Sequence, residues 1–140
     1  MAQTTSPVSE LSEAECWKLL HSNEFGRLAL SVANQPEIFP INYAIQAGTL
    51  VFRTSQGTKL AALTINDSIA LEIDGYDEAG GWSVIIKGHA RALEWGEDYE
   101  AAQVSGLRPW VATVKPVFVR VEPQYVSGRT FLFGPPPDEL

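Results

Sequence analysis

From residue 25 to residue 132 the chain is built of short, mostly alternating apolar and polar segments separated by turn residues. The segments of strand character are FGRLALSV, EIFPINYAI, TLVFRT, SIALEIDGY, WSVIIKGHARALEW, VFVRVEP and YVSGRTF. The first three are joined by ANQP and QAG, which are short enough to predict an antiparallel meander. Pro40 in the second segment favours an edge position or a bulge, and Gly88 in the fifth favours a bend.

Three stretches predict helices. In LSEAECWKLLHS, Ser12 and Glu15 form the pattern of a capping box, which predicts a helix over residues 12–22. A short helix is expected after Gly57, in GTKLAALTIN, and a modest one in GEDYEAAQVSGL. Six or seven short strands with few short helices predict a mainly β fold, a closed or nearly closed β-barrel whose ends the helices cover. We expect one domain over residues 1–140, with 1–8 and 134–140 as mobile tails.

The charge balance narrows the possible partners. The chain carries a formal net charge of −7, with only ten Lys and Arg residues spread along it. Such a chain is repelled by nucleic-acid phosphates and by anionic lipid, so neither is an expected partner. No apolar run is long enough to cross a membrane, the N-terminus lacks the pattern of a secretory signal, and Cys16 has no second cysteine to pair with. These features favour the cytoplasm, and two isolated histidines with one cysteine predict no metal site.

One stretch places positive charge beside a predicted helix start. In LVFRTSQGTKLAAL, Arg53 ends a strand and Lys59 opens a helix, with Thr58 or Ser55 as its expected cap. A helix N-terminus with unsatisfied N–H groups and two nearby cations suits a phosphate. The alternative is an ordinary turn, a cap and a solvated lysine, because the stretch has neither a Walker pattern nor a dinucleotide glycine fingerprint.

The order of FRTSQGTK, IFPINY and GWSVIIKG along the chain resembles that of the pyridoxamine 5′-phosphate oxidase-like flavoproteins. The similarity runs from about residue 9 to residue 131, and it is strongest to a small bacterial subgroup of nitroimidazole-resistance-like proteins and flavin nitroreductases. The resemblance implies a split β-barrel, a homodimer, and a flavin in the groove between two subunits. FMN is the usual cofactor in this family, and some relatives use a deazaflavin.

The resemblance also implies the site residues. Arg53, Thr58 and Lys59 become phosphate ligands, with Thr54 and Ser55 as further candidates. The flavin ring and the cofactor groove are expected beside two other stretches, which contribute Pro40, Ile41 and Asn42, and Trp82, Ser83 and Val84.

The expected function is an FMN-dependent oxidoreductase acting on a small organic molecule, because a bound flavin carries the redox chemistry and needs no protein acid or base. The only basic residue near the C-terminus is Arg129, where true pyridoxamine phosphate oxidases carry a basic region for the substrate phosphate, so vitamin B6 phosphate is not the expected substrate. Two alternatives stay open: a non-catalytic module that stores flavin or senses redox state, and a haem-binding relative of the same barrel that uses His89 or His21.

The sequence leaves the roles of three further side chains open. Trp110 either covers the cofactor or plugs an end of the barrel. His89 either faces the groove or is an ordinary strand residue. For His21, stabilisation of the first helix at its C-terminus is the expected role.

Overall fold

The computed structural model describes residues 6–55, 57–94, 96–103, 105–108, 110–111 and 115–136. Seven strands and three short helices lie within these ranges. In chain order they are β1 (Val8–Glu10), α1 (Glu13–His21), β2 (Phe25–Val32), β3 (Gln35–Gln46), β4 (Thr49–Thr54), α2 (Thr58–Ile65), β5 (Ser68–Tyr76), β6 (Gly80–Ala92), α3 (Glu97–Gln103) and β7 (Val117–Leu132).

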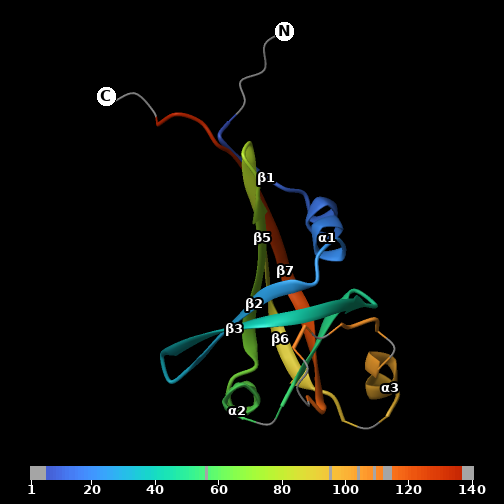
Figure 1. Cartoon of the computed structure of the whole chain (residues 1–140). Coiled ribbons are helices and arrows are strands. Elements are labelled where there is room, and N and C mark those ends of the chain that lie inside the picture. The colour runs from blue at the N-terminus through green and yellow to red at the C-terminus, as the bar shows by residue number, and fades with distance from the viewer. Residues whose placement is uncertain are drawn as a thin grey trace.

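The strands form one antiparallel sheet that closes on itself. Their order is β1-β7-β4-β3-β2-β5-β6, and β6 also pairs with β7, so six strands complete a barrel and β1 is added at one end. Figure 1 shows β5, β6 and β7 running along the molecule while β2 and β3 cross them, with α2 near one end and β1 toward the other. The predicted mainly β barrel is therefore confirmed. No helix in the described part of the chain is long and apolar enough to cross a bilayer.

The predicted meander corresponds to β2, β3 and β4. Its two turns pass through Ala33 and Asn34, and through Ala47 and Gly48, all with positive φ, the conformation that two-residue hairpin turns require. The first part of β3 pairs with β2 only, where Pro40 lies opposite Arg27, while its last four residues pair with β4. Pro40 therefore occupies a stretch with one unpaired side, as expected for a residue that lacks an N–H.

The last two predicted strands are one strand, β7, so the prediction of a break after Pro123 is wrong. A register shift between Lys87 and Gly88 of β6 lies opposite Pro123, and this bulge accommodates the proline without ending the pairing. A Cβ at Gly88 would lie 2.1 Å from the carbonyl oxygen of Glu122, so only glycine allows the two strands to approach this closely here.

Two other boundaries differ from those predicted. The helix expected in residues 96–107 is the shorter α3, which ends at Gln103. The expected N-terminal tail overlaps β1 at Val8, which pairs with Phe131 of β7. Residues 1–5 and 137–140 of the two expected tails lie outside the described residues.

Helix α1 covers the barrel core. Its capping box forms as predicted, with Glu15 N–H donating to Ser12 Oγ and Ser12 N–H donating to Glu15 Oε1. The buried residues Cys16 and Leu20 join the core, and the buried Tyr43 hydroxyl donates to the Leu20 carbonyl across 2.8 Å. A second, smaller cluster packs Val51 of β4 against Leu93, Ala102 and Phe118. Strand β4 is therefore buried on both faces until Arg53.

Candidate functional site

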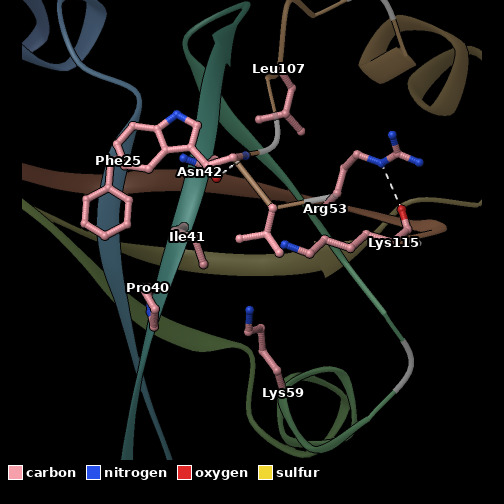
Figure 2. A pocket seen from close by; sticks show the side chains of 10 residues that line it. Phe25, Pro40, Ile41, Asn42, Arg53, Lys59, Leu107 and Lys115 are labelled. Atoms are coloured by element: carbon pink, nitrogen blue, oxygen red, sulfur yellow. Dashed lines mark hydrogen bonds between the residues drawn. The ribbon is translucent and has the colours of Figure 1, made fainter. Parts of the chain in front are cut away.

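A partly open pocket lies beside the meander, where β2, β3 and β4 meet α2 and the segment that leads into β7. Its volume is about 160 Å³. Figure 2 shows the side chains that line it: Phe25, Pro40, Ile41, Asn42, Arg53, Lys59, Leu107, Trp110, Val111 and Lys115. Five of the eleven residues predicted for the site thus come together here, from the three consecutive elements β3, β4 and α2.

One side of the pocket is cationic. Arg53 lies at the end of β4, where its Nε donates to the Lys115 carbonyl across 2.8 Å and its guanidinium carbon lies 4.7 Å from the centre of the Phe118 ring. Lys59 reaches in from the first turn of α2, with Nζ 5.1 Å from the centre of the Phe39 ring. Among the described residues, none of Arg53, Lys59 and Lys115 forms an ion pair with a carboxylate. Three positive charges therefore meet in a chain whose net charge is negative.

Burial and the close approach of these cations lower the pKa of Lys59. Burial lowers the pKa of its ammonium group below the usual lysine value, and the charge of Lys115 lowers it further. Both effects disfavour the charged form, and the attraction of an anion in the pocket would oppose them.

The other side of the pocket is aromatic. The rings of Phe25 and Trp110 are stacked, with their centres 4.9 Å apart and an angle of 7° between their planes. Glu24 Oε1 accepts a hydrogen bond from Trp110 Nε1 at 2.7 Å and one from Arg108 Nη2 at 2.6 Å, and these bonds lower the pKa of the Glu24 carboxyl group, Arg108 contributing most. The role of Trp110 stays a prediction: its indole forms a wall of the pocket, and the residue is 58% exposed.

A donor next to this wall lacks a partner. Asn42 Oδ1 accepts a hydrogen bond from the Trp110 backbone N–H at 3.0 Å. This bond fixes the orientation of the side-chain amide and so identifies its other atom as the donor Nδ2. That buried Nδ2 has no hydrogen-bond partner among the described residues. A buried donor without a partner costs about 1–3 kcal/mol, which an acceptor on a ligand can recover.

The neighbours of Arg53 and Lys59 in sequence do not line the pocket. Thr54 is buried, and its hydroxyl donates to the Ser55 carbonyl at 3.2 Å, while Ser55 and Thr58 are exposed. The prediction that Thr58 or Ser55 caps α2 is wrong: Gly57 is the N-cap and no side chain caps the helix. The chain enters α2 through a residue that has no side chain to offer, so the first N–H groups of the helix have no side-chain acceptor.

The third predicted stretch lies elsewhere on the barrel. Val84 is fully buried in the core, and Trp82 lines a separate recess with Tyr76 and Phe131. Ser83 pairs in register with Asp74 and Arg129. These residues belong to the half of β6 near the 77–79 turn, which Figure 1 places at the end of the molecule away from α2. Within one chain, Trp82, Ser83 and Val84 therefore do not reach the pocket.

The two histidines also lie outside the pocket lining. His89 Nδ1 lies 3.0 Å from Asp67 Oδ1 in an exposed pair, and His21 lies in the last turn of α1. Among the described residues, no three His, Cys, Asp or Glu side chains come together as a group that could hold a metal ion.

Comparison with known proteins identifies the family. The sequence model described as pyridoxamine 5′-phosphate oxidase matches residues 12–130. The chain belongs to the pyridoxamine 5′-phosphate oxidase family. It is 42% identical over 94 residues to an uncharacterized protein of Mycobacterium tuberculosis, a match that covers 67% of this chain and 86% of that relative.

Two solved structures are also similar to this member of the pyridoxamine 5′-phosphate oxidase family. The FAD binding protein from Mycobacterium smegmatis is 42% identical with a TM-score of 0.78, covering 89% of this chain and 99% of that one. A FAD-binding protein from Mesorhizobium loti is 28% identical with a TM-score of 0.77, covering 88% and 96%.

Sequence reasoning missed four residues that line this pocket. Three of them, Leu107, Val111 and Lys115, come from the segment between α3 and β7, which the sequence presents only as a loop. The fourth, Phe25, is the first residue of the predicted strand FGRLALSV, which is β2. A weak indication was available for Lys115. It comes just before β7, the strand that pairs with β4, and in that pairing Arg53 lies opposite Phe118.

Proposed function

We propose that this protein binds a flavin nucleotide in the pocket and uses it as an FMN-dependent oxidoreductase acting on a small organic molecule. The observation that carries the proposal is the cluster of Arg53, Lys59 and Lys115, without a carboxylate partner among the described residues, in the same pocket as the Phe25–Trp110 wall. A flavin nucleotide has the matching parts, a planar aromatic ring system and an anionic tail. The names of the two structural relatives, both FAD-binding, support a flavin.

The described residues fit such a ligand at both ends. Arg53 and Lys59 would hold the phosphate, with the first N–H groups of α2 and the exposed Ser55 and Thr58 close by in sequence. Pro40, Ile41 and Asn42 would run along the ring, where the unsatisfied Asn42 Nδ2 offers a donor to a ring carbonyl or nitrogen. Thr54 would act only through the backbone, because its side chain is buried.

A second copy of the chain would complete the site. The volume of about 160 Å³ is small beside the ~300–1,000 Å³ of typical ligand pockets, so the walls of one chain enclose only part of a flavin. In a homodimer, the stretch of β6 that carries Trp82, Ser83 and Val84 in one copy would lie against the pocket of the other. The partial exposure of Trp82 and Ser83 is compatible with this role, whereas the fully buried Val84 would act only by shaping the strand.

The bound flavin would supply the electron or hydride transfer, and the chain would bind, orient and shield it. The described lining contains no carboxylate, histidine, cysteine or hydroxyl group. Because the lining offers no such group to act on a substrate, a second candidate function remains, a non-catalytic flavin carrier or redox sensor. A haem site receives no such support, since His89 is engaged with Asp67 away from the pocket. The cytoplasmic location stays a prediction.

The test is a flavin titration of the purified chain, followed by absorbance and fluorescence, with a mass measurement of any copurified cofactor to distinguish FMN, FAD and deazaflavin. We expect tight binding that falls about 10²-fold or more when Arg53 and Lys59 are both replaced by Gln, since each charge-assisted hydrogen bond is worth about 1.5–3 kcal/mol. The matched control is Lys87→Gln, an exposed lysine on β6 outside the pocket. A wild-type chain that binds no flavin would refute the proposal.

Turnover separates the two candidate functions. With flavin bound, reduction by a nicotinamide donor and reoxidation by a panel of small organic acceptors is expected of the oxidoreductase. Bound flavin that never turns over would favour the carrier or sensor.

A further inference from the structure

The main chain and the side chain of Lys115 make different contacts. Its carbonyl oxygen accepts the 2.8 Å hydrogen bond from Arg53 Nε, which ties the segment before β7 to the end of β4. Its side chain lines the pocket. In Figure 2 the side chain extends from this anchored backbone toward the middle of the pocket, and the side chain of Lys59 rises toward the same space from α2.

Two ammonium groups that share a pocket repel each other, and the effect is visible in the lowered pKa of Lys59, to which Lys115 contributes after burial. Arg53 adds a third charge nearby. In the described part of the chain no carboxylate compensates them, although other cations of the same chain have carboxylate partners: Arg27 has Glu72 and Asp74, and Arg108 has Glu24. What distinguishes this pocket is that three cations without a carboxylate partner among the described residues line the same space.

We propose that Lys115 is a third cationic ligand of the bound anion and that it makes the pocket selective for a doubly charged phosphate group. This inference rests on the proposed function, because it concerns the anionic end of the same ligand. A phosphate monoester such as that of FMN and the diphosphate of FAD share this chemistry. Each presents about two negative charges at neutral pH and several acceptor oxygens, so it can accept from the two ammonium groups and the guanidinium at once. A neutral flavin such as riboflavin leaves all three cations uncompensated.

Arg53 then has two functions, one direct and one through Lys115. Its Nη groups are available to the anion, while its Nε holds the Lys115 backbone in place. Replacement of Arg53 therefore also removes part of the contribution of Lys115. The two residues should behave as a coupled pair, with a double variant that loses less affinity than the product of the single losses.

The experiment measures the affinity of the full chain for riboflavin, FMN and FAD in wild type, Lys115→Gln, Lys115→Arg and the control Lys87→Gln. We expect Lys115→Gln to weaken FMN or FAD binding about tenfold and riboflavin binding less than twofold, since only the phosphorylated ligands meet the lost charge. Lys115→Arg keeps the charge and should keep the selectivity. The comparison of FMN with FAD shows which phosphate source the pocket prefers.

Each other outcome overturns the inference in a distinguishable way. Equal weakening of riboflavin and FMN by Lys115→Gln would assign Lys115 a structural role only, and no change in either would exclude it from the site, while flavin binding itself still stands in both cases. A wild-type chain that binds none of the three flavins would refute the proposed function and this inference with it. Additive losses in the Arg53→Gln, Lys115→Gln cycle would refute the coupling.

Discussion

Burial and the positive charge of the neighbouring Lys115 both disfavour the charged form of Lys59. Its pKa in the free chain is therefore below the usual lysine value. A bound anion favours the ammonium form and raises this pKa. At pH values below the lowered pKa, Lys59 is charged with or without ligand, and the affinity for a phosphorylated flavin does not depend on its titration. As the pH rises through the lowered pKa, the free chain loses the proton, and affinity falls by up to about tenfold per pH unit until the pKa of the complex is reached.

This titration is measured as the dissociation constant for FMN from pH 7 upward. We expect weakening to begin at a lower pH than an ordinary lysine would produce. Lys59→Arg is the matched control: its guanidinium stays charged throughout, while the ligand titrates as it does with wild type, so the difference between the two profiles isolates Lys59. Superimposable profiles would show that Lys59 does not contact the anion.

At the scale of residues, the sequence was informative where the side chains that line the pocket lie close together in the chain. Arg53 and Lys59 are six positions apart and both reach the pocket, because a strand end and a helix start are held side by side by one short connection. Asn42 was nominated as well, but its unsatisfied amide was not, because that state follows from a hydrogen bond with Trp110, 68 residues later. Lys115 was missed for the same reason, since its position depends on a contact with Arg53 across 62 residues.

At the scale of elements, the segment that carries Arg108 and Trp110 is fastened to the start of β2 by one carboxylate. Glu24 accepts from both residues, and the Trp110 ring stacks on Phe25 next to it. The lowered pKa of Glu24 means that this attachment persists at neutral pH and is lost as the pH falls through that lowered value. Glu24→Gln imitates the protonated side chain at neutral pH.

We expect Glu24→Gln to weaken flavin binding about twofold to fivefold, which is the worth of an exposed ion pair. It should also reduce the quenching of tryptophan fluorescence by the flavin at saturation, because the Trp110 wall is less firmly held. Glu122→Gln removes an exposed carboxylate that pairs with Arg91, and serves as the control. Unchanged quenching in the Glu24 variant would mean that the stack on Phe25 alone positions the indole.

The element boundaries show what alternation and turn residues cannot predict. Both meander turns were located because the strands on either side alternate and each turn contains one residue that tolerates positive φ, Asn34 or Gly48. The break assigned after Pro123 failed because a proline ends a strand only if the partner cannot adapt, and the partner here has a bulge at Gly88. The cap assigned to Thr58 or Ser55 failed because propensity names the residue type that caps a helix, whereas the path of the chain put Gly57 at that position.

At the scale of the whole molecule, the single chain leaves an open pocket at one end and exposed apolar side chains at the other. The pocket near α2 is small and open, and at the opposite end Tyr76, Leu132 and Phe133 leave large apolar side chains 84%, 53% and 55% exposed. Apolar groups gathered at one end are typical of a surface that another molecule covers. A homodimer in which the β5–β6 end of each copy approaches the pocket of the other would bury both features together.

Mixing two defective chains tests this arrangement directly. Lys59→Ala damages the cationic side of the pocket, and Trp82→Ala damages the residue expected to arrive from the partner. In a mixed dimer of the two variants, one site carries both defects and the other carries neither, so flavin binding should reappear on mixing although each variant alone binds weakly. Sedimentation of the wild type should give twice the chain mass of 15.3 kDa at micromolar concentration. If Trp82→Ala binds flavin normally, or if mixing restores nothing, the pocket is complete within one chain and the apolar end serves another partner.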